Sequence, residues 1–332
     1  MAAISSASPS RVTNRPLSVR SNRDAEVHPV GCRAALRKLL DPFVVLRFSV
    51  TVNPTALLAA FLLPIMVAVG AELPGEGLIL DLDAAKGLSL EDGDKVAAWR
   101  NQVAASSARD FVKRDEGRKE SGSGRPVWRK EVPELKGKPS LVFFQQELVC
   151  FDDDSFDGLT TGKGHTWIAV LAVHDQRVGL KDVNSFFGNL RNGDKFEGVW
   201  GCLNDDNTLW WGTRNGLTFG RFDTNNPQLL GPMLEGGKFY LVAGRMGAGE
   251  GKVKLELFTN STKPVTTADF PVNPKANPSR MVVGQERDAI QHPGEESFDG
   301  EIARFLIWER PLSDAQLALA MVHLRATYFK AP

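Results

Sequence analysis

The sequence predicts an all-β protein, a two-sheet antiparallel sandwich that ends in one amphipathic helix, and three observations support this prediction. From Leu78 onward, short apolar runs recur between clusters of Gly, Asp and Asn, which is typical of strands joined by turns. No helical pattern separates these runs, so neighbouring strands are expected to pair in antiparallel order. The final stretch, residues 298–328, reads as a strand, one turn and a helix.

The first 71 residues read as an export leader rather than as part of this fold. Residues 48–71 carry no charge and contain the apolar core ALLAAFLLPIMVAVGA. The segment ends in small residues of the kind that a signal peptidase reads, so we expect cleavage after Ala71. An uncleaved membrane anchor is the alternative, although polar and proline residues interrupt the run.

Residues 1–47 form a basic, polar leader that we expect to be disordered. Residues 1–71 hold eight Lys or Arg and three Asp or Glu, a net charge of +5. This charge keeps the leader in the cytoplasm and sends residues 72–332 to the periplasm, the cell surface or the medium. Because the leader is unusually long for a signal peptide, the assigned start codon is itself open to revision.

The exported part, residues 72–332, has the length of one large all-β domain and is mildly acidic. Its 32 basic and 37 acidic residues give a net charge of −5. No cluster of Lys and Arg interleaves with aromatic residues, which argues against nucleic acid or an anionic membrane surface as a partner. Contact with a membrane is expected only through residues 48–71, if they are not cleaved.

The strands of this domain are predicted from seven apolar runs. They read LILDL, PSLVFF, HTWIAVLAV, TLWWG, KFYLVAGRM, KVKLELF and SRMVVG. In KVKLELF, apolar and charged residues alternate, so one face of that strand is buried and the other is wet. Residues 167–173 are apolar on both faces, so this strand is expected to lie centrally and to be covered on both sides.

The C-terminal helix is predicted from a capping box. Ser313 caps the first free amides, and Gln316, three residues on, reaches back to complete the box. The apolar residues that then share one face at helical spacing are Leu317, Ala320, Met321, Leu324 and Tyr328. This stripe is expected to dock the helix on the outside of the sandwich.

Four blocks of the sequence occur in an order and spacing that resemble a known family. They read LILDLDAAKGLSLEDGDKVAAWRNQV, RPVWRKEVPELKGKPSLVFF, FDGLTTGKGHTWIAVLAV and FDGEIARFLIWERPLSDAQ. Together with the helix that follows the last block they span residues 78–328, and they resemble the laminin G-like, concanavalin A-like jelly-roll domains of exported bacterial proteins. The resemblance implies a jelly-roll sandwich, a fold that hosts lectins, adhesion modules and polysaccharide-cleaving enzymes.

The enzymes of this fold that cleave β-glucans resemble one another in a catalytic pattern, Glu-x-Asp-x-x-Glu. The sequence lacks this pattern. The nearest match is ERDAIQ, where Glu286 and Asp288 are in step but Gln291 replaces the second glutamate and cannot exchange a proton. The histidines are scattered, and only Tyr240 and Tyr328 follow the leader, so no lyase grouping of His, Tyr and Arg is recognised. The sequence therefore predicts no catalytic residues.

Trp210 and Trp211 are the first candidates for a binding site. Because they are adjacent in a predicted strand, their rings point to opposite faces, and one of them must lie in the core. The other is a candidate platform for the C–H face of a sugar ring. Asn204, Asp206 and Arg214 lie nearby in the sequence and offer hydrogen bonds.

Two further features predict a metal ion and a disulfide. Asp152, Asp153, Asp154 and Asp157 form an oxygen-rich loop of the kind that binds Ca²⁺, and exposed turns are the alternative. Cys150 and Cys202 are the two cysteines that follow the leader, which in an exported chain makes them a candidate disulfide; two buried free thiols are the alternative.

The sequence thus predicts an exported, non-catalytic module that binds carbohydrate, a polysaccharide or glycoconjugate, at the cell surface or in the periplasm. Two alternatives stay open. The first is a polysaccharide-cleaving enzyme of the same fold with an unrecognised site, and the second is a protein-adhesion module.

Overall fold

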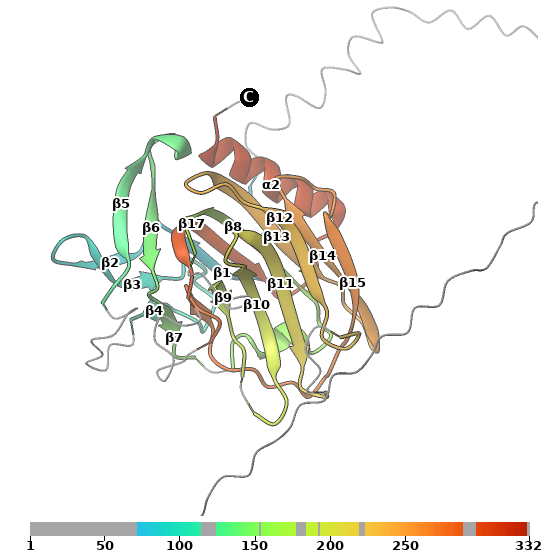
Figure 1. Ribbon diagram of the computed structural model, residues 1–332. Coiled ribbons are helices and arrows are strands. Elements are labelled where there is room, and N and C mark those ends of the chain that lie inside the picture. Colours follow the sequence, from blue (N-terminus) through green and yellow to red (C-terminus); the bar gives the residue numbers. More distant parts are fainter. Residues whose placement is uncertain are drawn as a thin grey trace, which may run out of the picture. The chain divides into compact units, whose positions relative to one another are not determined.

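A computed structural model of the chain describes residues 72–113, 124–152, 154–176, 184–191, 193–218, 223–287 and 297–330. Within these residues the protein is all-β with one C-terminal α-helix, as the sequence predicts (Figure 1). The leader, residues 1–71, lies outside the described residues, and so do the predictions made for it. Within the described part, no helix is long and apolar enough to cross a membrane.

The described residues form seventeen strands, two short 3-10 helices and helix α2. The strands are β1 Leu78–Asp83, β2 Leu88–Glu91, β3 Lys95–Arg100, β4 Asp110–Val112, β5 Val127–Val132, β6 Lys138–Phe144, β7 Leu148–Cys150, β8 His165–Val173, β9 Asn184–Gly188, β10 Glu197–Leu203, β11 Thr208–Asn215, β12 Gln228–Met233, β13 Phe239–Met246, β14 Lys252–Thr259, β15 Thr266–Pro271, β16 Val282–Val283 and β17 Asp299–Trp308. The helices are η1 Pro133–Leu135, η2 Asp157–Thr160 and α2 Asp314–Tyr328.

Antiparallel ladders join all of these strands into one continuous hydrogen-bonded sheet, where the sequence predicted two separate sheets. β8 lies between β13 and β17, and β17 also pairs with β1 and β6. β10 lies between β9 and β11. The short strand β16 accounts for the continuity, because Val282 pairs with Val149 of β7 on one side and with Gly188 of β9 on the other.

Two groups of strands nevertheless face each other across the main hydrophobic core. The indole of Trp167 on β8 meets that of Trp211 on β11 edge-to-face, with ring centroids 5.9 Å apart. The ring centroids of Phe187 on β9 and Phe305 on β17 lie 4.9 Å apart. Since β8 and β17 do not pair with β9 or β11, these contacts cross the interior rather than a ladder.

Strand β8 is buried on both faces, which confirms the prediction for residues 167–173. The side chains that face the main core are Trp167, Ala169, Leu171 and Val173. The side chains on the opposite face, which pack in a second cluster with α2, are Ile168, Val170 and Ala172. An uninterrupted apolar run is therefore what this position in the fold requires.

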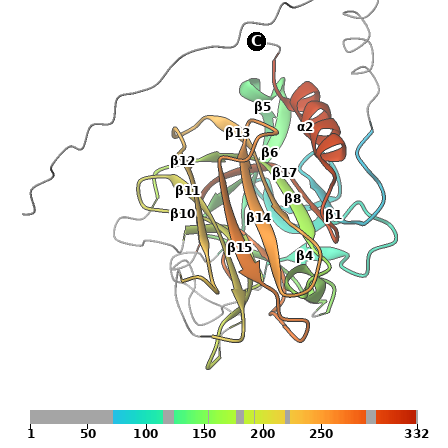
Figure 2. The ribbon, with the colours of Figure 1, turned by 90° about the vertical axis from the view of Figure 1, so that its right-hand side faces the viewer.

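Helix α2 begins and docks as the sequence predicts (Figure 2). The Ser313 side chain accepts a hydrogen bond from the Gln316 amide at 3.3 Å, and the Gln316 side chain accepts one from the Ser313 amide at 3.2 Å. The buried side chains of α2 are Leu317, Ala320, Met321, Leu324 and Tyr328. They pack with apolar side chains of β8, β13 and β17, so the helix covers the outer face of these three strands.

Candidate functional site

Trp210 and Trp211 point to opposite faces of β11, but both indoles are fully buried. Trp211 lies in the main core beside Trp167, whereas Trp210 lies on the other face, 5.6 Å from the ring of Trp200. The expectation that one ring is exposed as a sugar platform is therefore corrected. β11 lies between β10 and β12, and the apolar side chains around it cover both of its faces.

The structure brings Arg214 to the same face as Trp210. The Arg214 guanidinium lies 5.1 Å from the centre of the Phe196 ring and 5.7 Å from that of Trp200, and Arg214 is itself buried. These contacts are cation–π interactions that hold the guanidinium against the aromatic cluster. The arrangement stabilises this face of β10 and β11, but it presents little surface to a ligand.

Asn204 and Asp206 lie apart from this cluster, in the turn between β10 and β11. The Asn204 amide donates to the Thr208 carbonyl at 3.0 Å, and an Asp206 carboxylate oxygen accepts from the Thr208 amide at 2.9 Å. Both residues thus close a tight turn, as Asn and Asp often do. Arg214 lies near the other end of β11, so the structure does not join these side chains into one site with it.

In the acidic loop, for which the sequence predicted a calcium ion, the Asp152 carboxylate accepts hydrogen bonds from nearby backbone amides. Asp152 accepts hydrogen bonds from the amides of Asp154 and Ser155 at 3.2 and 3.0 Å, and Asp157 begins η2. Asp153 lies outside the described residues. Across the part of the chain that the structure describes, no three His, Cys, Asp or Glu side chains are grouped to hold a metal ion. The calcium site stays a prediction.

Cys150 and Cys202 are both buried and are not bonded to each other, so the candidate disulfide is corrected to two separate thiols. Cys150 packs in the main core, whereas Cys202 packs with Trp200 and Trp210 in a different cluster. Side chains that face different clusters cannot bring their sulfur atoms to bonding distance. Burial raises the pKa of the Cys150 thiol to about 11, so this thiol is an unreactive core residue.

A network of charged and polar side chains that the sequence did not reveal lies on the outer face of β5, β6 and β17. At its centre is Glu301, whose side chain is 6% exposed. Glu301 accepts a hydrogen bond from Arg129 Nη1 at 2.8 Å and one from Ser140 Oγ at 2.5 Å. His174, directly after β8, places Nε2 3.4 Å from a Glu301 carboxylate oxygen. We call these four residues the Glu301 network.

The electrostatics of the Glu301 network favour its charged forms. Burial favours a higher pKa for Glu301, but hydrogen bonds from His174 and Ser140 and the charge of Arg129 outweigh it and lower the pKa. The hydrogen bond with Glu301 raises the pKa of His174 above its usual range, against the smaller effect of burial. The network therefore holds Arg129 and His174 in fixed positions around a buried anion.

Phe144 lies beside the Glu301 network and is 67% exposed. On β6, Leu141 and Phe143 face the core, so Val142 and Phe144 face outward with Ser140. In the register of β6 and β17, Val142 lies opposite Glu301 and Phe144 lies opposite Asp299. Phe144 and Glu301 are therefore diagonal neighbours on one face, with their Cβ atoms roughly 7 Å apart.

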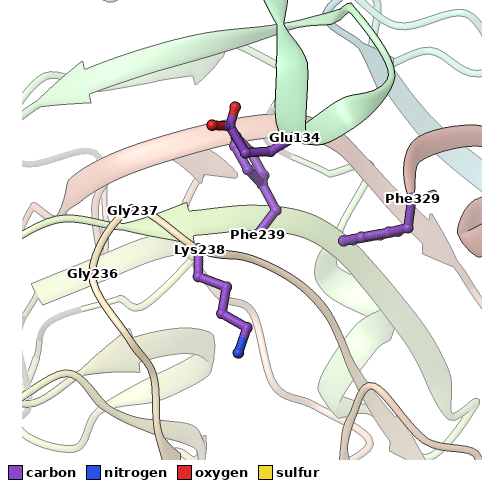
Figure 3. Close-up of a pocket in the computed structure, with 6 residues that line it drawn as sticks. All are labelled: Glu134, Gly236, Gly237, Lys238, Phe239 and Phe329. Carbon is purple, nitrogen blue, oxygen red and sulfur yellow. The ribbon is translucent and has the colours of Figure 1, made fainter. Parts of the chain in front are cut away.

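A pocket of about 410 Å³ lies near the C-terminal end of α2, where Phe329 is one of its lining residues (Figure 3). It is lined by Glu134, Gly236, Gly237, Lys238, Phe239 and Phe329. Glu134 lies 3.8 Å from Arg129 Nη2, and the Gly237 amide donates to the Val173 carbonyl, one residue before His174. The network, Phe144 and this pocket together form the candidate binding face of the protein.

Comparison with known proteins gives little further guidance. No family model matches the chain, and no curated protein matches its sequence. Trypanosoma rangeli sialidase in complex with 2,3-difluorosialic acid is similar at 13% identity and a TM-score of 0.47, over 79% of this chain and 35% of that one. The chain thus spans about a third of the length of that sialidase.

Two binding domains are also similar to this chain. The CBM40 of a Ruminococcus gnavus IT-sialidase, bound to α2,3 sialyllactose, has 19% identity and a TM-score of 0.37, over 51% of this chain and 84% of that one. The binding domain of botulinum neurotoxin DC in complex with SialylT has 11% identity and a TM-score of 0.44, over 75% of this chain and 52% of that one. These scores are too low to carry an argument about fold or function.

Proposed function

We propose that this chain is an exported, non-catalytic module that binds a polysaccharide or glycoconjugate through the candidate binding face. In this proposal its fold is a laminin G-like jelly roll, which the facing strand groups around the main core support. Export rests on the uncharged segment 48–71 and on the basic leader before it. Binding takes place at the cell surface, in the periplasm or in the medium.

The observation that carries this proposal is the exposed ring of Phe144 beside the Glu301 network. Sugar rings present C–H groups on their faces and hydroxyl groups at their edges. An aromatic ring suits the first, and a few fixed polar groups suit the second. Phe144 supplies the ring, and Arg129 and His174 supply hydrogen-bond donors whose positions are set before a ligand arrives.

Affinity measurements on a panel of immobilised glucans, galactans and polyuronates test this proposal. Phe144→Ala should weaken binding of the retained polysaccharide roughly tenfold, because a large apolar contact is lost while the fold is unchanged. Phe151→Ala is the matched control, because Phe151 is another exposed phenylalanine and directly follows β7, which pairs with β4 and β16 rather than with β6 or β17. Equal affinity in both variants and the wild type would remove Phe144 from the binding site.

The two competing functions give different results in the same assay. Release of soluble sugar from the panel at substoichiometric protein would identify a polysaccharide-cleaving enzyme. Capture of one protein partner with no retained glycan would identify an adhesion module. Addition of a chelator tests the predicted calcium at Asp152, Asp153, Asp154 and Asp157, because retention that depends on the ion should then be lost.

A further inference from the structure

The solvent-facing groups of the Glu301 network are donors rather than acceptors. Glu301 is 6% exposed and Asp299, on the same strand, is also buried, whereas the side chains of Arg129 and His174 are 41% and 35% exposed. An approaching ligand therefore meets a guanidinium and an imidazole, with the carboxylates beneath them. Hydrogen-bond donors at a surface select ligands that bring acceptors.

Arg129 makes a second contact that a ligand can replace. Its Nη2 atom lies 3.8 Å from Glu134, whose side chain is 55% exposed. A long ion pair between exposed groups contributes little to stability. Its geometry shows, however, that a carboxylate can occupy this position beside Arg129 without disturbing the hydrogen bond from Nη1 to Glu301.

We infer that the ligand of this face is an acidic glycan, and that Arg129 and His174 bind the carboxylate of a uronic acid whose ring lies against Phe144. This inference rests on the proposed glycan-binding function and names its substrate class. The ligand carboxylate displaces Glu134 and accepts charge-assisted hydrogen bonds from Arg129 and from the protonated imidazole. A neutral sugar brings only hydroxyl groups to the same donors and binds more weakly.

Recognition of the carboxylate comes from directed donors rather than from net charge. The charged groups that face His174 are Glu301 and Asp299 from β17 and Arg129 from β5. Two buried carboxylates thus offset the two cations, so binding should depend only modestly on salt. Protonation of His174 adds one donor and one positive charge, so affinity for the acidic glycan should rise as the pH falls.

The test compares a polyuronate with the same polymer after its carboxylates have been reduced to alcohols. The protein should bind the polyuronate about tenfold more tightly, the effect expected of one charge-assisted contact. Glu134→Gln should strengthen binding of the polyuronate severalfold, because the competing carboxylate is removed, and should leave the reduced polymer unaffected. Glu131→Gln is the matched control, because Glu131 is an exposed carboxylate on β5.

A second variant, His174→Gln, tests the contribution of His174 to carboxylate binding and should leave the fold unchanged. Measured at about pH 5 and about pH 8, wild-type affinity for the polyuronate should be higher at the lower pH. His174→Gln keeps an amide donor but cannot titrate, so this difference should disappear. If the difference persists in the variant, His174 is not the titrating group and its part in the inference is overturned.

The outcomes separate this inference from the proposed function. Equal affinity for both polymers, with loss of both in Phe144→Ala, would overturn the acidic ligand and leave glycan binding in place. Binding of neither polymer nor any other glycan of the panel would overturn glycan binding itself. A preference for the polyuronate that Glu134→Gln increases would support the inference.

Discussion

Arg304 on β17 donates two hydrogen bonds to Asp81 on β1, from Nε to one carboxylate oxygen and from Nη2 to the other, each 2.8 Å long. A second carboxylate, that of Asp83, lies 3.3 Å from Nη1. All three side chains are nearly buried. Burial favours a lower pKa for Arg304, but the hydrogen bond and the charge of Asp81 outweigh it and raise the pKa, so the guanidinium stays charged. This pairing fixes β1 against β17, far apart in sequence.

Removal of Arg304 should therefore destabilise the fold. Arg304→Met keeps the volume but leaves two nearly buried carboxylates without their cation, which should lower the free energy of unfolding by roughly 3 kcal/mol. Urea denaturation monitored by tryptophan fluorescence measures this change. Arg304→Met combined with Asp81→Asn and Asp83→Asn should recover part of the loss. If Arg304→Met alone is as stable as the wild type, the ion pairs contribute nothing to stability.

Docking of α2 makes a second prediction. Leu317 and Met321 are buried against the outer face of the sheet, so replacing both by Asp should lower stability by several kcal/mol, because a charge would be buried without a partner. Leu319 and Val322 lie on the exposed side of the same helix. The same double substitution at these two positions is the matched control, and it should leave the melting temperature nearly unchanged. Similar losses in both variants would mean that helix propensity, not docking, decides the effect.

The N-terminal cap of α2 should contribute separately. Ser313→Ala removes the side chain that accepts from the Gln316 amide and should cost about 1 kcal/mol. Ser313→Asp should retain most of the stability, since a carboxylate also accepts this hydrogen bond and favours the positive end of the helix dipole. Thermal unfolding of the three proteins gives the comparison. An alanine variant with wild-type stability would mean that water replaces the cap at no cost.

The elements that sequence reasoning predicted well depend on contacts between near neighbours in the chain. The two residues of the capping box, Ser313 and Gln316, are three positions apart, and the two buried faces of β8 follow from one apolar run. The Trp210–Trp211 pair shows where such reasoning stops. Alternation correctly placed the two rings on opposite faces, but the burial of Trp210 depends on Trp200, from the neighbouring strand.

The candidate binding face lay beyond sequence reasoning for a related reason. Glu301 receives hydrogen bonds from Arg129 and Ser140, which lie 172 and 161 residues away in the chain. Only the order of β5, β6, β17 and β8 in the sheet brings these residues together. Phe144 is one of nineteen phenylalanines in the sequence, and its neighbours in the chain give no local signal that it belongs to a binding face. To predict the candidate binding face from the sequence, the order of the strands in the sheet would have to be known.

His165 makes the last prediction, which concerns the stability of the core in acid. This residue on β8 is fully buried; its Nδ1 lies 2.7 Å from the Leu159 carbonyl oxygen, and its ring meets that of Trp211 edge-to-face. Burial lowers the pKa of His165 to about 4, since the core disfavours the charged imidazole. The folded protein therefore keeps His165 neutral at a pH where the unfolded chain already binds a proton.

The sign of the effect follows from this difference in proton binding. Above the unfolded pKa of about 6.5, neither state is protonated at His165 and the fold is unaffected. As the pH falls from there toward about 4, the unfolded state gains a proton first, so stability drops by roughly 3 kcal/mol in total. Unfolding free energies measured across this range should decline less steeply in His165→Gln than in the wild type. His323→Gln, at a half-buried histidine of α2, should retain the full decline. An unchanged slope in His165→Gln would assign the acid sensitivity to carboxylates instead.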